Sequence, residues 1–326
     1  KIESLVSIWQ TRKLTLYGKI TIIKTLLISQ LIYKFTTLPT PKLEVKRKID
    51  KILFDFLWSN RKHYIAKTII IQKLENGGLN MVDIFLKEIA MKCSWVKRMC
   101  NEHDIFLYQA MKYFILGDSF HDIFWQGNLN VSDGLKFINK HSPFWKSLVQ
   151  AWCIYNYHIP ETVPEILNQP VWFNSFIKIN KESIFYRSLY DNGIIYVSNL
   201  YHNDRTLMTA QEIANKYHVT NIMQINHVLS AVPQKWKTLI GNYNPETDYT
   251  MNSKSKFQKA VSSSKISKYV YDSLVQSKYE KRYYIIADHL VDYWTHELDD
   301  LIDELDLSRA FSLIPKVVVL PKYKYF

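Results

Sequence analysis

The sequence predicts a mainly α-helical protein, and three features support that fold class. Apolar residues make up 47% of the chain, which is enough to bury a core and excludes intrinsic disorder. Only 8 of the 326 residues are glycine, which argues against the Gly-rich phosphate-binding loops of many α/β enzymes. Apolar residues recur at intervals of three and four in several segments, which is the helical period. We expect an N-terminal helical bundle, then a helical connection with short strands, and a small α+β unit.

Residues 1–62 are expected to form the helical bundle. Apolar residues at 2, 5, 6 and 9 predict a first helix, and Thr15 is placed to cap the second. Residues 18–35 are apolar nearly all round, which predicts a buried helix, and a third helix is expected at about 42–58 after two prolines. The side chains expected inside the bundle are those of Ile20, Ile23, Leu27, Leu31, Ile52, Phe56 and Trp58.

The segment 63–160 is expected to connect the bundle to the small unit. The β-branched run 64–71 predicts an extended segment, and Glu75-Asn76-Gly77-Gly78 predicts a turn. A helix is expected at about 83–100. Residues 101–160 are rich in aromatic side chains and are expected to be irregular. Three prolines then indicate a linker: Pro160, Pro164 and Pro170.

The small α+β unit is expected to span residues 161–245. A strand is predicted at 176–179, a turn at Asn180-Lys181 and a short helix at 183–190. Thr209-x-x-Glu212 is a capping-box pattern, which predicts a helix ending near Tyr217 and followed by another at about 221–231.

The last segment, 246–326, is expected to be helical and truncated. Residues 241–256 are predicted to form a linker, and apolar residues at alternating intervals of three and four predict a helix at about 287–307. Its polar side carries Asp299-Asp300, the only adjacent aspartates in the chain. Asp303 and Glu304 share that side, so we expect an acidic helical face there and no catalytic metal site.

Positive charge is concentrated in the first third of the chain. The net charge is +12, and residues 1–100 contain 19 Lys and Arg against 7 Asp and Glu. Residues 101–326 contain 23 of each sign and are therefore neutral. A surplus confined to one end predicts a surface that faces a polyanion, although a basic solubilising face is the alternative.

The sequence contains no complete catalytic or metal-binding motif. It has no P-loop, no G-x-S-x-G, no H-E-x-x-H and no G-x-G-x-x-G. Cys93 and Cys100 are six residues apart, which does not fit the C-x2-4-C pairs of structural zinc sites. We expect no catalytic residue, no metal site and no cofactor.

The number of cysteines and the apolar runs predict where the protein resides. Three cysteines give an odd count and no disulfide framework, which indicates a reducing compartment. The longest apolar stretch, 20–35, is interrupted by Lys24 and Lys34 and is shorter than the ~20 residues of a membrane span. We expect no membrane partner. Both ends of the chain are expected to be cut from a longer polypeptide.

The first sixty residues contain an ordered series of short motifs. They are Trp9-x-x-Arg12-x-Leu14-Thr15-Leu16-x-Gly18-Lys19-Ile20, Lys24-Thr25-Leu26, Leu31-Ile32-Tyr33, Pro39-x-Pro41 and Phe56-Leu57-Trp58. Together they closely resemble the thumb that follows the catalytic palm in reverse transcriptases of non-LTR (LINE-class) retrotransposons.

Two later blocks extend the resemblance to most of the chain. Glu75-Asn76-Gly77-Gly78-Leu79 and the helix reaching Trp95 are similar to the segment after the thumb in that family. Three further motifs resemble the C-terminal extension of one invertebrate and fish branch: Ile184-Phe185-Tyr186, Tyr190-x-x-Gly193-Ile194 and Ala231-Val232-Pro233-x-x-Trp236-Lys237. The resemblance is strong over 1–100, moderate over 170–240 and weak at the end.

The resemblance implies an origin in an RNA-directed DNA polymerase that primes on nicked target DNA. The family's palm, with its metal-binding aspartates, and its nuclease have no counterpart in this sequence. The chain is therefore expected to be non-catalytic, although the parent polymerase would use Mg. The partners implied are RNA, an RNA–DNA hybrid template–primer, target DNA, and the palm and fingers of the same polypeptide. The resemblance also implies an intracellular location, nuclear or cytoplasmic, as part of a retrotransposon ribonucleoprotein.

A thumb holds the template–primer duplex through its phosphates, which requires Lys, Arg and small hydroxyl side chains and no base code. The residues that fit this role are Arg12, Lys13, Lys19, Thr21, Thr25, Arg47, Lys48, Lys51, Arg61 and Lys62.

Two other functions remain open from the sequence. Residues 211–232 could form a helix-turn-helix with Ala214 at the small-residue position, although nearby lysines are few for holding a duplex. This alternative predicts sequence-specific DNA binding that survives deletion of 1–62. The aromatic middle and the acidic C-terminal helix could instead form a protein-interaction scaffold, which predicts negligible affinity for nucleic acid.

Overall fold

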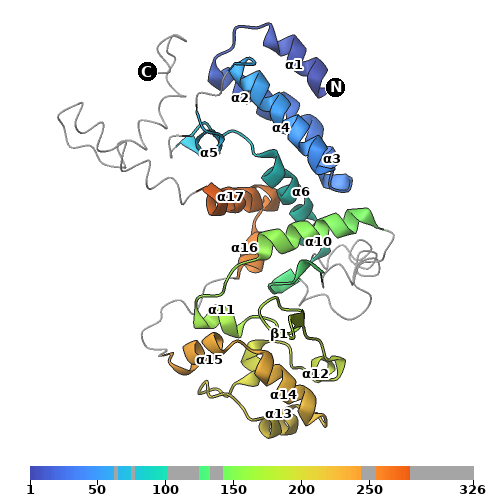
Figure 1. Ribbon diagram of the computed structural model, residues 1–326, viewed down its shortest axis with the longest axis vertical. Helices are drawn as coiled ribbons and strands as arrows, with labels where there is room; N and C mark the ends of the chain where they lie inside the picture. The colour runs from blue at the N-terminus through green and yellow to red at the C-terminus, as the bar shows by residue number, and fades with distance from the viewer. Residues whose placement is uncertain (62–64, 75–77, 101–124, 133–141, 244–254, 280–326) are drawn as a thin grey trace, which may run out of the picture. The chain divides into compact units, whose positions relative to one another are not determined.

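A computed structural model describes residues 1–61, 65–74, 78–100, 125–132, 142–243 and 255–279. The described residues are mainly helical, with one two-stranded sheet among them, as the sequence predicts (Figure 1). The chain divides into two compact units. The first contains Lys1–Met91 and the segment that begins at Ser267, and the second is Lys92–Ile266. The four predicted segment boundaries, 1–62, 63–160, 161–245 and 246–326, stay predictions.

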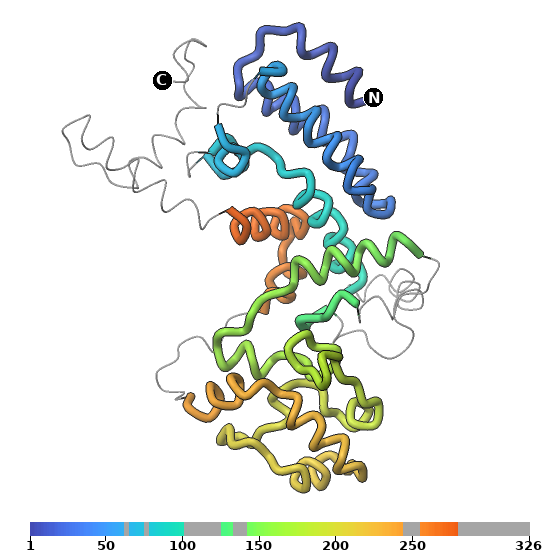
Figure 2. The backbone as a smooth tube through the Cα atoms, in the orientation of Figure 1, coloured from blue at the N-terminus to red at the C-terminus, as the bar shows by residue number. Residues whose placement is uncertain are grey.

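The N-terminal bundle has helices at the three places that the sequence predicts. The first is α1 (Ile2–Gln10) and the last is α4 (Leu43–Trp58). The single helix predicted at 18–35 is present as two, α2 (Leu16–Ile22) and α3 (Ser29–Thr37). The predicted cap at Thr15 is confirmed, since its hydroxyl accepts a hydrogen bond from the Gly18 backbone N–H at 3.2 Å. Figure 2 shows that these helices lie side by side.

A π-helical turn, η1 (Ile23–Leu27), joins α2 to α3. There the Ile28 N–H donates to the carbonyl of Ile23, five residues earlier, at 2.8 Å. Turns of this kind inside α-helices are frequent at functional sites. The sequence predicts the helix but gives no sign of this change in pitch.

The core of the first unit contains the residues predicted to lie inside the bundle. Ile20, Ile23, Leu27, Leu31 and Phe56 are buried. Ile52 and Trp58 are partly buried and pack against this core. The prediction is confirmed for the first five residues, whereas the last two lie at the edge of the core.

The predicted extended segment at 64–71 is wrong, because α5 (Lys67–Ile71) is a short helix. Ile70 and Ile71 are fully buried in the first core, and this packing outweighs the β preference of branched side chains. Gly78 lies so close to the C-terminal end of α5 that a Cβ at this position would be 2.2 Å from the carbonyl oxygen of Gln72. Glycine is required at this position for steric reasons.

Helix α6 (Ile84–Met99) confirms the helix predicted at 83–100. Its N-terminus is capped by Asp83, whose Oδ1 accepts hydrogen bonds from the N–H groups of Phe85 at 2.8 Å and Leu86 at 3.3 Å. The boundary between the two units falls inside this helix, at Met91.

Helix α17 (Ile266–Tyr279) belongs to the first unit for nearly all of its length, and the sequence does not predict it. Tyr279 is buried in the core of that unit, and Tyr271, Leu274 and Val275 pack against it. A segment almost two hundred residues from α6 therefore completes the N-terminal core.

The second unit contains helix α10 (Pro143–Asn156), within a segment predicted to be irregular. That prediction is wrong because large aromatic side chains bury one side of this helix. The Trp152 ring meets Trp125 edge to face at a centroid distance of 6.0 Å, and its Nε1 donates to the Trp125 carbonyl at 3.0 Å. Helix α16 (Lys256–Ser262) begins at the cap Ser255, where the sequence predicts the end of a linker.

The predicted linker around three prolines is also wrong. Helix α11 (Val163–Leu167) starts at a capping box formed by Thr162 and Glu165. Pro160 and Pro170 are buried, and Val163 and Ile166 lie in the core of the second unit. These prolines shape a packed turn rather than a flexible connection.

The only sheet among the described residues is a hairpin of β1 (Lys178–Ile179) and β2 (Glu182–Ser183). Asn180 and Lys181 both have positive φ, 50° and 70°, which is the backbone of a two-residue hairpin turn. The predicted turn is confirmed. The helix predicted at 183–190 starts later, as α12 (Arg187–Asp191), because Ser183 pairs with Lys178 in the sheet.

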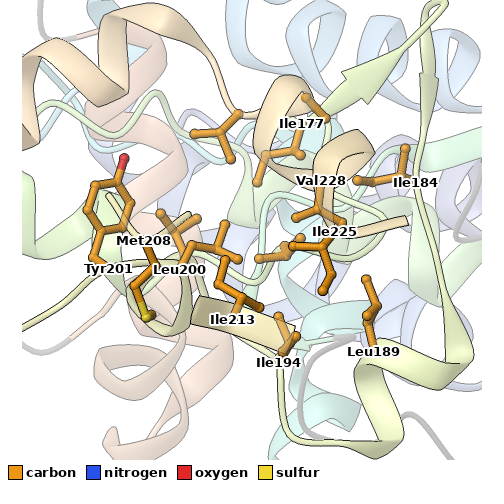
Figure 3. Close-up of a cluster of buried hydrophobic side chains, with 14 of the residues drawn as sticks. Ile177, Ile184, Leu189, Ile194, Leu200, Tyr201, Met208, Ile213, Ile225 and Val228 are labelled. Atoms are coloured by element: carbon orange, nitrogen blue, oxygen red, sulfur yellow. The ribbon is translucent and has the colours of Figure 1, made fainter. Parts of the chain in front are cut away.

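The rest of this small unit is helical. After the turn η3 (Val197–Leu200), the predicted capping box of Thr209 and Glu212 opens α13 (Ala210–Tyr217). Helix α14 (Ile222–Ala231) follows as predicted, and α15 (Gln234–Gly241), which is not predicted, begins directly after Pro233. Figure 3 shows the buried side chains at the centre of the unit, among them Ile177, Leu189, Ile194, Ile213, Ile225 and Val228.

Several predictions lie outside the described residues. They are the acidic helix at 287–307, most of the turn at 75–78 and the side chain of Lys62. Within the described part of the chain, no helix is both long enough and apolar enough to cross a bilayer.

Candidate nucleic-acid interface

Three of the predicted phosphate contacts lie together on the outer face of α4. Arg47, Lys48 and Lys51 are exposed, and Lys51 follows Lys48 by three residues and Arg47 by four, so the three share one side of the helix. The opposite side of α4 is held in the core by Leu53 and Phe56. Burial of the apolar side therefore directs these cations to solvent.

Three carboxylates lie near this face: Glu3, Glu44 and Asp55. Lys48 forms a 3.0 Å ion pair with Glu3 of α1, and the two side chains are 71% and 65% exposed. Such a pair contributes little stability in water, so a phosphate could replace the Glu3 carboxylate. Glu44 and Asp55 also lie on α4, so the helix presents a mixed surface with an excess of positive charge.

Three other carboxylates of the first unit are bound by lysines. Glu88 pairs with Lys46 at 3.4 Å and Asp50 pairs with Lys67 at 2.5 Å. Asp83, whose side chain is 1% exposed, pairs with Lys278 at 3.0 Å. These carboxylates are buried or half-buried and each is neutralised by its lysine, so none of the three offsets the charge of the exposed cations on α4.

Asp83 is the most heavily bonded of these groups. Its Oδ2 accepts hydrogen bonds from Tyr279 Oη at 2.7 Å and Lys278 Nζ, and its backbone N–H donates to Tyr271 Oη at 2.9 Å. These hydrogen bonds and the Lys278 charge outweigh desolvation, and the pKa of Asp83 is lowered. Asp83 before an apolar run is a recognisable helix-cap signal, but no sequence feature points to its partners on α17.

Arg12 and Lys13 are exposed in the joint between α1 and α2. The guanidinium carbon of Arg12 lies 4.5 Å from the centre of the Trp9 ring, a cation–π contact. Contact through the face of a guanidinium leaves its N–H groups directed outward from the edge. Arg12 is thus suited to bind a phosphate without losing its contact with Trp9.

Lys19 has a different role from the other predicted cations. Its ammonium donates to the carbonyl of Leu57 at 3.1 Å and to the hydroxyl of Ser59, both at the C-terminal end of α4. Partial burial, and then repulsion from Arg61, lower the pKa of Lys19. Lys19 therefore ties α2 to the end of α4, where a cation also compensates the helix dipole.

Thr21 and Thr25 are exposed, as expected for a surface that another molecule approaches closely. Their hydroxyls donate to the carbonyls of Tyr17 at 3.0 Å and Thr21 at 2.8 Å. Ser29 continues the same line and donates to Leu26 at 2.8 Å. Because the donors are used within the helix, the hydroxyls present small, accepting oxygen atoms to the outside.

The structure thus groups the predicted residues into subsets. Arg47, Lys48 and Lys51 form one cluster, which the Lys48–Glu3 pair joins to α1. Lys19 and the exposed Arg61 lie together at the end of α4. Among the residues the structure describes, no group of three or more His, Cys, Asp or Glu could hold a metal ion.

Helices α13 and α14, the alternative DNA-binding pair, present a different surface. The exposed residues at the start of α14 include Ile222 and Met223, which are apolar. The turn before them contains His218 with φ of 54°, so the usual glycine of such a turn is replaced by histidine. This pair offers fewer cations to a duplex than α4 does.

No protein-family model matches the chain.

Proposed function

We propose that this chain is a non-catalytic part of a non-LTR retrotransposon reverse transcriptase that grips template–primer nucleic acid through its phosphates. The observation that carries the proposal is the exposed cluster of Arg47, Lys48 and Lys51 on α4. It lies within the first hundred residues, where the entire net charge of +12 resides. The motif resemblance over the same residues supports the thumb assignment.

In this proposal the cations of the first unit neutralise phosphates and release condensed counterions, which favours binding at low salt. Phosphate contacts position a duplex without reading its sequence. Thr21 and Thr25 allow a sugar–phosphate strand to approach the helix surface closely. The ligands are RNA, an RNA–DNA hybrid and target DNA.

The chemistry belongs to the palm and fingers of the same polypeptide, which would hold the Mg ions of the polymerase. This chain supplies the grip on the product duplex, in an intracellular ribonucleoprotein. On this proposal the chain itself contributes no group to the chemical step.

The salt dependence of binding to an RNA–DNA hybrid tests this proposal. Each phosphate contact removed lowers the slope of log affinity against log salt by ~0.9 on a duplex. Changing Arg47, Lys48 and Lys51 together to Ala should therefore flatten the slope by up to ~3 by the same rule. The matched control is Lys235→Ala with Lys237→Ala on α15, which should change the slope little.

The comparison between the two variants decides the outcome. An equal decrease of the salt slope in both variants would indicate a diffuse basic surface and would contradict specific binding by α4. A larger loss from the α15 variant would place the binding site on the second unit, near the alternative helix pair. Affinity that depends strongly on the hybrid's sequence would favour that alternative as well.

A further inference from the structure

The second unit contains a cavity of about 450 Å³ that the α4 surface does not include. Ser94, Lys97, Arg98 and Cys100 line it from the C-terminal part of α6. Val261 of α16 and Ile266, the first residue of α17, form its other side. The volume lies within the range of small-molecule and cofactor sites.

Positive charge dominates the lining of this cavity. Among the described residues that line it, Lys97 and Arg98 are charged and none is a carboxylate. The adjacent stretch 255–266 adds three lysines and contains no Asp or Glu. An ammonium has three N–H donors, and the bond from Lys97 to the carbonyl of Ser263 uses one of them. The cavity is therefore suited to an anion.

Arg98 is held in place at the rim of the cavity by an aromatic contact. Its guanidinium carbon lies 4.7 Å from the centre of the Trp95 ring. Trp95 in turn packs edge to face against Phe144 and Trp145, at centroid distances of 5.6 Å and 6.1 Å. A guanidinium restrained in this way loses less rotamer entropy when it binds a phosphate.

We infer that this cavity binds a nucleotide, with Lys97 and Arg98 on the phosphate and Val261 and Ile266 against the base or sugar. The apolar side chains favour a phosphate that carries an apolar or aromatic body over a bare inorganic anion. The size excludes a duplex but accepts one nucleotide of a single strand or a free mononucleotide.

The inference rests on the proposed nucleic-acid function and adds a single-strand site to it. The proposed duplex site on α4 and the proposed nucleotide site at Lys97 and Arg98 use different side chains. An experiment can therefore contradict one of these two proposals without contradicting the other. The charge count along the sequence does not single out this site, because Lys97 and Arg98 fall within the basic first hundred residues and are counted together with the cations of α4.

Cys100 provides a direct reporter of occupancy. It lines the cavity and is partly exposed, whereas Cys93 and Cys153, the other two cysteines of the chain, are buried. A neutral maleimide should therefore label one cysteine per chain rapidly, and intact-mass spectrometry counts the adducts. The substitution Cys100→Ser should abolish this rapid adduct. A probe at ten times its Kd should slow the labelling about tenfold, since about one tenth of the protein stays unbound.

The probes are AMP, a short single-stranded oligonucleotide, a blunt duplex and inorganic phosphate, each added to the full chain. We expect AMP and the single strand to protect Cys100, and phosphate at the same concentration to protect it far less. Absence of protection by AMP and the single strand would overturn the inference. Equal protection by phosphate alone would overturn the nucleotide assignment and leave a plain anion site.

The variants are Arg98→Ala and the double change of Lys97 and Arg98 to Ala, with Lys259→Ala on α16 as the matched control. Arg98 is exposed, so its replacement should leave the fold intact. A variant that unfolds is recognised because all three cysteines then react rapidly with the maleimide. Both variants should lose protection by AMP while Lys259→Ala keeps it. Protection that persists in both would place the ligand elsewhere. The Arg47, Lys48 and Lys51 variant should keep AMP protection, which separates this result from the duplex test.

Discussion

At the scale of single residues, Lys19 and Arg47 show that one positive charge can take two roles. Both lie in the basic N-terminal third and both fit a phosphate contact by sequence. Arg47 is exposed on α4, whereas the Lys19 ammonium is bound to the carbonyl of Leu57 and to Ser59. The difference follows from which elements pack together, and charge alone does not reveal it.

Single substitutions of these two residues should change different properties: Lys19→Ala the stability, and Arg47→Ala the salt dependence of binding. Lys19→Ala removes hydrogen bonds to the end of α4 and should lower the free energy of unfolding by ~1 kcal/mol, with little effect on the salt slope of binding. Arg47→Ala should leave stability within ~0.5 kcal/mol and flatten the slope by ~0.9. Denaturant titration and salt-dependent binding measure both effects. A slope change from Lys19→Ala equal to that of Arg47→Ala would assign Lys19 to the interface.

Leu27 provides the test of the bundle core, because its side chain is fully buried in the π-helical turn. Leu27→Ala should lower the free energy of unfolding by ~2–5 kcal/mol through lost burial and the cavity left behind. The control is Ile8→Ala, since Ile8 is 54% exposed and should cost far less. A loss below about 0.5 kcal/mol for Leu27→Ala would contradict the bundle packing.

At the scale of elements, α17 stabilises the first unit through a buried polar cluster. Asp83 caps α6 and also accepts a hydrogen bond from Tyr279 Oη. The pKa of Tyr279 is raised by burial and by this hydrogen bond to Asp83. Since the folded pKa lies above the unfolded value of ~10, the contribution to stability is complete below pH ~10 and is lost as the pH rises above it.

Tyr279→Phe should therefore destabilise the protein by ~1.5–3 kcal/mol at pH 7, since it removes a hydrogen bond to a charged group. The difference between wild type and variant should shrink as the pH rises above ~10. Chemical denaturation at pH 7, 9 and 11 measures it. Tyr269→Phe on the same helix is the control, and an equal loss from it would show that the Asp83 bond is not the cause.

At the scale of the whole molecule, the distribution of charge bears on two properties, the binding of a polyanion and metal-dependent catalysis. The excess positive charge lies in residues 1–100, and part of the negative charge of this segment is buried in pairs such as Lys46–Glu88. Divalent-metal chemistry needs carboxylates that share a site beside the reacting phosphate. Among the described residues, Glu88, Asp50 and Asp83 are each paired with a lysine, and no group of three or more His, Cys, Asp or Glu could hold a metal ion.

The purified chain should consequently extend no primer. An RNA template with an annealed DNA primer, all four dNTPs and either Mg²⁺ or Mn²⁺ should give no incorporation, while the same preparation still binds the hybrid. The matched assay adds a separate active polymerase to show that the template and nucleotides are intact. Incorporation by a homogeneous, nuclease-free preparation would contradict the non-catalytic assignment.

The sequence by itself determines the features that depend on neighbouring residues. Helices α1 to α4, α6, α13 and α14 follow from apolar periodicity, and the caps at Thr15 and Thr209 follow from local hydrogen bonding. The hairpin turn at Asn180-Lys181 follows from the tolerance of asparagine for positive φ. Five of the core residues predicted for the bundle follow from the same periodicity.

Only the tertiary structure decides the features that depend on distant partners. The run 64–71 has β preference, but burial of Ile70 and Ile71 makes it helical. α10 is ordered by tryptophan packing, and α17 reaches Asp83 from almost two hundred residues away. For the candidate site, the sequence gives the positions of the positive charges. Packing separates those that face solvent, such as Arg47, from those that hold helices together, such as Lys19, because burial and hydrogen-bond partners belong to the folded chain.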